Sequence, residues 1–180
     1  MKAKIVKTQK QQKGFTLIEM IIAIAIIAIV AIPLGYLGVK AMGSATANSE
    51  GQITQGYLND LKTKYPRGPY TGLNNQMVID AGVPDDATIS GTTISNLWGY
   101  SIVFTAGTLT GGTANGAIQM VNTVPADACL NYVSKTSDSA DEVLVGTTTV
   151  KTVGGVLNNA TATTACAVST ATVGVTLRKA

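Results

Sequence analysis

The sequence predicts an α+β protein in which one long N-terminal helix leads into a single β-rich globular unit. Two observations predict the helix: residues 20–39 contain no charged residue, and apolar residues then continue at helical spacing as far as Tyr65. A third observation predicts the β-rich unit, because short β-branched segments alternate with glycine-containing turns beyond residue 99. A chain of 180 residues has room for one such unit beside the helix, and not for two.

Residues 1–14 form a basic leader, with five lysines and no acidic residue. Lysines ahead of an apolar run keep that end of a chain cytoplasmic, so we expect everything beyond residue 14 to face the other side of a membrane. The whole chain has thirteen basic and ten acidic residues, which leaves eight basic against ten acidic residues after the leader. This balance, without any basic patch, argues against a nucleic-acid partner.

Residues 15–39 are predicted to form a transmembrane half of the helix. The uncharged run of twenty residues from 20 to 39 rises about 30 Å as a helix, which is the thickness of a bilayer core. Pro33 has no amide hydrogen, so it predicts a helix kink near the far end of this run.

Residues 40–65 are predicted to continue the same helix as an amphipathic half. Apolar side chains return at helical spacing, and Pro66 ends the pattern. The apolar positions are Ile53, Tyr57, Leu58, Leu61 and Tyr65.

Residues 66–180 are predicted to form the globular head. Residues 66–95 are rich in turn residues and predict a loop region with short elements. Further along, β-branched segments predict strands, and a segment with proline near its first turn predicts a short helix. The predicted strands are 100–107, 117–121, 143–151, 154–159 and 172–179, and the predicted helix is 125–135.

Cys129 and Cys166 are the two cysteines of the chain, and both lie in the part expected to be exported. Thiols in such compartments tend to pair, so we expect a disulfide, with two free buried thiols as the alternative. A bridge that closes this loop stabilises a fold by roughly 3.5 to 4 kcal/mol in the chain-entropy model.

The segment "KGFTLIE" at residues 13–19 combines features that point to a processing signal. Gly14 precedes the aromatic Phe15, and Glu19 is the one acid at the start of the apolar run. A charge within a membrane-spanning helix is costly, so it usually has a function. Together with the lysine leader, the segment resembles the class III signal of the type IV pilin family, which prepilin peptidase recognises.

The resemblance implies cleavage between Gly14 and Phe15 on the cytoplasmic face, followed by N-methylation of Phe15. Glu19 would then lie one helical turn from the new amine. In a bundle of parallel helices, Glu19 of one subunit can pair with the Phe15 amine of its neighbour, and that pairing offsets the cost of burying either charge. The alternative role for Glu19 is a solvated carboxylate at the headgroup level that stabilises the helix N-terminus.

The later part of the chain carries a second resemblance, to type IVb pilins and in particular to the major pilins of conjugative thin pili. The segments "NLWGYSIVF" and "VPADACLNYV", followed by the late Cys166, carry this likeness. It implies an antiparallel β-sheet packed on the second half of the long helix, with a C-terminal disulfide loop at the filament surface. The 14-residue leader and Phe15 depart from this subclass toward the type IVa pattern.

Two other functions remain open at this stage. Type II secretion pseudopilins share the N-terminal motif, and their heads often bind calcium through late acidic residues; Asp138, Asp141 and Glu142 are candidates here, against a solvated acidic turn without metal. An ordinary secreted protein, cleaved after the "ATA" sequence, would begin near Asn48.

The sequence does not predict an enzyme, because it has no histidine, no Cys-x-x-Cys pair and no nucleotide-binding motif. We expect no cofactor and no metal. The expected partners are identical subunits in a helical filament, prepilin peptidase, the inner-membrane assembly machinery and, before assembly, membrane lipid. The expected location is the inner membrane, with one span and a cytoplasmic N-terminus, and then an extracellular filament that serves adhesion, conjugation or motility.

Overall fold

The computed structural model describes residues 17–84, 89–167 and 172–180, and it describes no side chain for residues 19, 23, 25 and 27–42. The chain divides into two compact units, Met1–Lys40 and Ala41–Ala180. The predicted leader lies outside the described residues.

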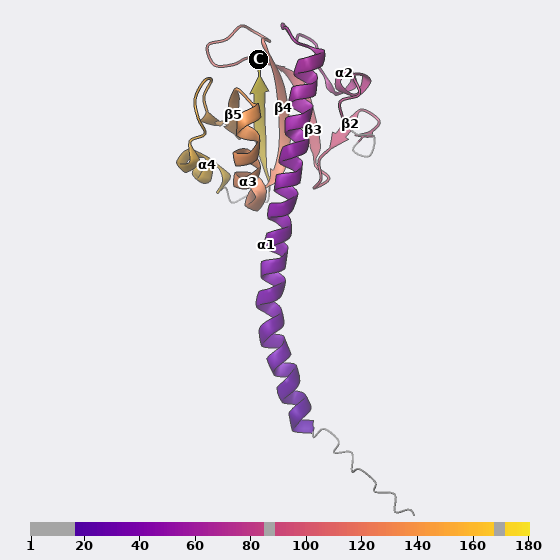
Figure 1. Ribbon diagram of the computed structural model, residues 1–180, viewed down its shortest axis with the longest axis vertical. Helices are drawn as coiled ribbons and strands as arrows, with labels where there is room; N and C mark the ends of the chain where they lie inside the picture. The colour runs from indigo at the N-terminus through magenta and orange to yellow at the C-terminus, as the bar shows by residue number, and fades with distance from the viewer. Residues whose placement is uncertain (1–16, 85–88, 168–171) are drawn as a thin grey trace, which may run out of the picture. The chain divides into compact units, whose positions relative to one another are not determined.

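Helix α1 (Leu17–Lys64) is the first element of the fold (Figure 1). Its bounds agree within two residues with the predicted helix, and Lys62 and Lys64 in the last turn favour the negative end of the helix dipole. Helical backbone continues through Pro33, and the kink there stays a prediction. Within the part of α1 whose side chains are described, no stretch is both long enough and apolar enough to cross a membrane; most of the predicted span lies outside that part.

Seven strands in the described part of the head form one antiparallel sheet in the order β1-β2-β3-β4-β7-β5-β6. Their bounds are β1 Ile89–Ser90, β2 Thr93–Ser95, β3 Ser101–Gly107, β4 Ala117–Pro125, β5 Glu142–Val145, β6 Thr148–Lys151 and β7 Thr172–Lys179. The last strand, β7, lies inside the sheet, where it pairs with β4 over eight residues and with β5 over four. The predicted α+β class with an antiparallel sheet is therefore confirmed.

The strand predictions hold with two exceptions. The segment 143–151 is a hairpin of β5 and β6, whose turn contains Gly146 at φ 59°, a conformation that suits glycine. The predicted strand 154–159 is wrong: these residues lead into helix α4 (Asn159–Cys166), which Asn158 caps by accepting a hydrogen bond from Thr161 N. The loop region before residue 95 contains α2 (Asn75–Asp80), β1 and β2.

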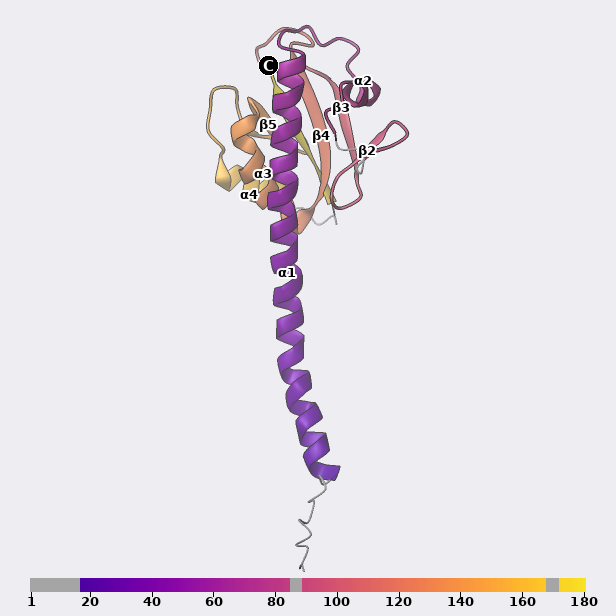
Figure 2. The ribbon, with the colours of Figure 1, turned by 45° about the vertical axis from the view of Figure 1, so that its right-hand side comes forward.

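The core lies between the sheet and two helices on one of its faces. Helix α3 (Ala126–Thr136) lies beside the second half of α1, and both cover the same side of the sheet (Figures 1 and 2). Leu58 and Leu61 of α1 are fully buried, as are Phe104 of β3 and Met120 of β4. Because inward residues alternate along β4 and β7, each strand presents an apolar row to the helices.

Candidate functional site

The predicted processing and assembly residues lie at the N-terminal end of the chain. Gly14 and Phe15 are outside the described residues. Glu19 lies on α1, but its side chain is outside the described part. Cleavage, N-methylation and the pairing of Glu19 with a neighbouring amine therefore stay predictions.

The first turns of α1 expose an unusual amount of apolar surface. Leu17 is 79 % exposed, and six further large apolar side chains up to Ile26 are exposed as well. They are Ile18, Met20, Ile21, Ile22, Ile24 and Ile26. Soluble monomers rarely expose contiguous apolar patches of this kind, so this surface requires lipid or protein to cover it.

A cluster of five buried polar residues joins α1 to the sheet and to α3. Its members are Glu50, Thr54, Asn96, Asn122 and Tyr132, and we call it the polar cluster. Asn122 Nδ2 donates to Glu50 Oε1 at 2.9 Å and to Tyr132 Oη at 3.0 Å. Thr54 Oγ1 lies 3.0 Å from the same Tyr132 oxygen. Because α1, β4 and α3 each supply a partner, these bonds fix how the three elements pack.

The polar cluster also holds the loop before β3. Asn96 Nδ2 donates to Asn122 Oδ1 at 2.6 Å, while Asn96 Oδ1 accepts from the backbone N–H groups of Trp98 and Tyr100. Glu50 Oε2 accepts from Leu97 N at 3.0 Å. A carboxylate on the long helix is thus bonded directly to a loop of the head.

Glu50 is 1 % exposed, and its partners are uncharged donors. Burial raises the pKa of its carboxyl from the usual 4.5, while the hydrogen bonds from Leu97 N and Asn122 act in the opposite direction. Burial likewise raises the pKa of Tyr132. Glu50 therefore makes the stability of the head depend on pH.

We expect the variant Glu50→Gln to lose this pH dependence. Just above pH 4.5 the folded chain keeps a proton on Glu50 that the unfolded chain has released. Lowering the pH from 7 toward 4.5 therefore raises the free energy of unfolding of the wild type. The wild-type free energy of unfolding should rise relative to that of the variant by about 1.4 kcal/mol for each unit by which the pKa is raised. Urea unfolding between pH 7 and 4, followed by Trp98 fluorescence, measures the difference, because the full effect is reached only below pH 4.5. A pH-independent difference would contradict the role of Glu50.

The disulfide predicted between Cys129 and Cys166 is present and confirmed. It joins α3 to α4 with a Cα–Cα distance of 5.7 Å across 37 positions of sequence. Both cysteines are buried. Ala162 and Cys166 are the buried residues of α4, so the bridge and the packing of Ala162 together anchor this short helix. The loop that it closes contains β5 and β6.

The acidic segment at residues 138–142 is solvated only in part: Asp138 is exposed, whereas Glu142 is not. Glu142 is fully buried on β5, where its Oε2 accepts from Arg178 Nη1 at 2.9 Å and its Oε1 accepts from Thr110. Burial raises the pKa of Glu142, but the bonds from Thr110 and Arg178 and the charge of Arg178 outweigh it and lower the pKa. Asp141 Oδ2 accepts from the backbone N–H of Ala180. Among the described residues, no cluster of three or more acidic, cysteine or histidine side chains is suited to a metal ion.

Comparison with known proteins decides the family. A family model described as PilS N terminal matches residues 44–178, which is more than half of the chain. The chain belongs to the PilS family. A second model, described as the prokaryotic N-terminal methylation motif, matches residues 9–35 of this pilin. No curated protein matches the sequence.

Two solved structures share the fold of the pilin. The type IV b pilin from Salmonella typhi has 18% sequence identity and a TM-score of 0.55, and the match covers 73% of this chain and 97% of that chain. TcpA, a type IV pilin from the Vibrio cholerae El Tor biotype, has 12% identity and a TM-score of 0.53, with 73% and 99% covered.

The family, the methylation motif and the shared fold identify the chain as a type IV pilin, a structural subunit of a pilus. The matches do not favour the pseudopilin alternative. Membership of the family implies polymerisation into filaments, and the motif implies processing by prepilin peptidase. The solved pilins that share the fold are structural proteins.

Sequence reasoning missed the polar cluster of this pilin. Glu50 and Asn122 are 72 positions apart, and neither stands in a motif. One signal was available: Glu50 interrupts the helical face between Ala47 and Thr54 that is buried in the structure, and an acid on a buried helical face needs partners.

Proposed function

We propose that this pilin is the main subunit of a thin helical filament on the surface of a Gram-negative bacterium. Prepilin peptidase removes residues 1–14 between Gly14 and Phe15, and the new N-terminus of Phe15 is methylated. The single observation that carries the proposal is the match of the N-terminal methylation motif to residues 9–35. The exposed apolar flank of α1 supports it, because polymerisation covers such a surface.

Glu19 provides the specific contact between subunits in this proposal. It pairs with the methylated amine of Phe15 in a neighbouring subunit, and the same pair repeats along the filament. A lone buried charge is strongly unfavourable, whereas a paired one is tolerated, so neighbouring helices must align where Glu19 meets the amine. The pair therefore sets the axial register of the helices more than it increases the stability of the filament. The contact is heterologous, which produces an open filament and not a closed ring.

Residues 15–39 anchor the pilin in the inner membrane before assembly, with the leader in the cytoplasm. An inner-membrane assembly machine then moves these residues from lipid into the filament interior. Both environments are apolar, so the transfer exposes little apolar surface to water. In the finished filament the head, residues 66–180, faces outward and serves adhesion, conjugation or motility.

N-terminal analysis of sheared surface filaments by mass spectrometry tests the proposal. We expect this chain to be the main component, and we expect its first residue to be N-methylated Phe15. The variant Gly14→Val should keep its leader and give no filaments, because a β-branched residue obstructs the approach of the peptidase to the backbone. A mature chain that begins near Asn48, or that retains its lysine leader in filaments, would refute the proposal.

A further inference from the structure

A small pocket lies at the end of the head where α1 ends, with a volume of about 110 Å³. Its lining includes Tyr65, Arg67, Tyr70, Thr71, Leu73 and Met77, and we call it the Arg67 pocket. Met77 belongs to α2, and the others lie in the segment between α1 and α2. Helix α2 lies beside this end of α1 in both views (Figures 1 and 2).

Three cations gather at this end of α1. Lys62 and Lys64 lie in its last turn, and Arg67 follows it. Residues 61–79 contain no acid. Lys64 and Arg67 are exposed, and within the described structure neither forms an ion pair or a side-chain hydrogen bond. These two charges are therefore available to an anion from outside the subunit.

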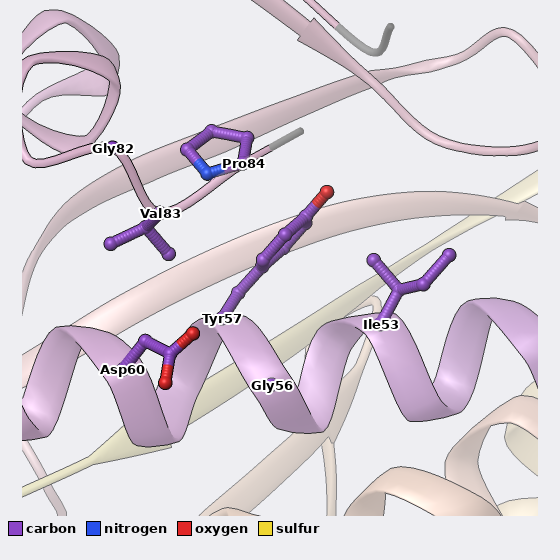
Figure 3. A pocket seen from close by; sticks show the side chains of 7 residues that line it. All are labelled: Ile53, Gly56, Tyr57, Asp60, Gly82, Val83 and Pro84. Atoms are coloured by element: carbon purple, nitrogen blue, oxygen red, sulfur yellow. The ribbon is translucent and has the colours of Figure 1, made fainter. Parts of the chain in front are cut away.

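Three other cations of the head already have partners. Lys151 and Lys179 donate to backbone carbonyl groups, and Arg178 is held in a buried ion pair. Asp60, the nearest acid to the free cations along the chain, lines a separate groove of about 320 Å³ together with Tyr57 (Figure 3). The cations with unused donors therefore lie mainly near the Arg67 pocket.

Lys62 holds one wall of the Arg67 pocket in place. Its Nζ donates to Tyr70 Oη at 2.9 Å, and Tyr70 Oη donates to the backbone oxygen of Tyr65 at 3.1 Å. The same ammonium lies 5.6 Å from the centroid of the Tyr70 ring, within the range of a cation–π interaction. Tyr70 N also donates to Asn115 O at 2.8 Å. The wall is therefore fixed before a ligand arrives, which lowers the entropy cost of binding.

The lining of the pocket combines three kinds of group. Arg67 supplies a guanidinium, which can bind a carboxylate through two parallel hydrogen bonds. Thr71 Oγ1 accepts from Asn115 Nδ2 at 3.3 Å, so the hydroxyl of Thr71 still has its own hydrogen to donate. Leu73 is buried, whereas Met77 is 37 % exposed and offers an apolar edge. A charged donor, a hydroxyl and an apolar surface fit a ligand that carries a partner for each.

We propose that the Arg67 pocket binds an acidic sugar of a surface polysaccharide. The carboxylate of the sugar pairs with Arg67, a ring hydroxyl accepts from Thr71, and the C–H face of the ring contacts Met77. Inorganic phosphate would use Arg67 alone. A nucleic acid suits the pocket less well, because its affinity grows with the number of neutralised phosphates and three cations of the described structure lie here. The inference deepens the adhesive role in the proposed function, on which it rests.

Titration of sugars into the full-length pilin in detergent tests the pocket. Trigalacturonic acid and sialyllactose are the acidic probes, and galactotriose and lactose are their neutral counterparts. At least one acidic probe should bind, with an affinity that falls as salt is added, and its neutral counterpart should bind at least about tenfold more weakly. Equal binding of an acidic probe and its neutral counterpart, or no binding of either acidic probe, would overturn the proposal.

Matched charge variants locate the binding. Arg67→Gln should weaken binding of the acidic probe about tenfold, because hydrogen bonds to a charged partner are lost. Arg67 is exposed, so this variant should unfold at the same urea concentration as the wild type. Lys135→Gln also removes one positive charge, keeps most of the side chain that packs against Gly51, and should leave the affinity unchanged. Equal losses in the two variants would show attraction by net charge alone and contradict a site at Arg67.

Thr71→Val separates a sugar from a bare anion. The variant keeps the shape of the side chain and removes its hydroxyl, so it should weaken binding of the acidic sugar about fivefold and leave binding of inorganic phosphate unchanged. A single-stranded oligonucleotide should bind more weakly than the sugar at the same salt concentration. If the oligonucleotide binds as tightly as the sugar, or if Thr71→Val leaves sugar binding unaffected, the assignment to a sugar is wrong.

Filament counts separate this inference from the proposed function. Arg67→Gln should give normal numbers of filaments by electron microscopy, and these filaments should lose their retention on a surface coated with the acidic sugar. If wild-type filaments form but no acidic sugar binds, the inference is wrong and the filament function stands. If the chain forms no filaments, the proposed function fails and the adhesive role fails with it, while the titration in detergent still decides whether the pocket binds the sugar.

Discussion

Replacing both Cys129 and Cys166 by alanine is expected to lower the free energy of unfolding of the head by about 4 kcal/mol. The bridge joins residues 37 positions apart. In the chain-entropy model its loss raises the conformational entropy of the unfolded chain, which favours unfolding. The native state weakens as well, because Ala162 is the other buried residue of α4. Helix α4 and residues 152–158 before it should then be the first part of the head to separate from the sheet.

Urea unfolding of the full-length pilin in detergent measures this effect. Trp98 reports on the head because it is the one tryptophan of the chain and packs edge-on against Tyr132, with ring centroids 6.3 Å apart. Limited proteolysis should cut the variant within residues 152–167 and leave the wild type intact. Reduced wild type is the matched control and should behave like the variant. A change below about 1 kcal/mol would show that packing alone holds α4.

Replacing Glu19 by alanine is expected to abolish surface filaments while a membrane pool of folded pilin remains. If Glu19 pairs with the Phe15 amine of a neighbour as proposed, the variant leaves that amine buried without a partner. Breaking a buried ion pair costs roughly 3 to 5 kcal/mol, so each docking step should weaken by more than about a hundredfold. Electron microscopy counts the filaments, and immunoblots of membranes measure the pool.

Two control variants separate charge from shape at this position. Glu19→Gln keeps the size of the side chain and removes its charge, so it should fail nearly as severely as alanine. Asn59→Ala changes an exposed position on the same helix and should leave piliation normal. Normal filament numbers in the alanine variant would remove the assembly role of Glu19.

Local patterns in the sequence were enough to predict most elements of the head. β-branched segments predicted the strands that became β3, β4 and β7, and Pro66 marked the end of α1 within two residues. Helix α4 was missed because its threonines and Asn159 have weak preferences for helix, which offset the strong preference of its alanines. The cap at Asn158 that starts it is a single side-chain contact.

By itself, the sequence determined the long helix with its processing motif and, because the chain has two cysteines, the partner of each. These features depend on neighbours along the chain or on composition. Only the tertiary structure decided that β7 lies between β4 and β5, that Glu142 is paired with Arg178 in the interior, and that Glu50 meets Asn122. Burial of a polar group is favourable only when a distant segment supplies its partner, and no local pattern encodes where that segment will lie.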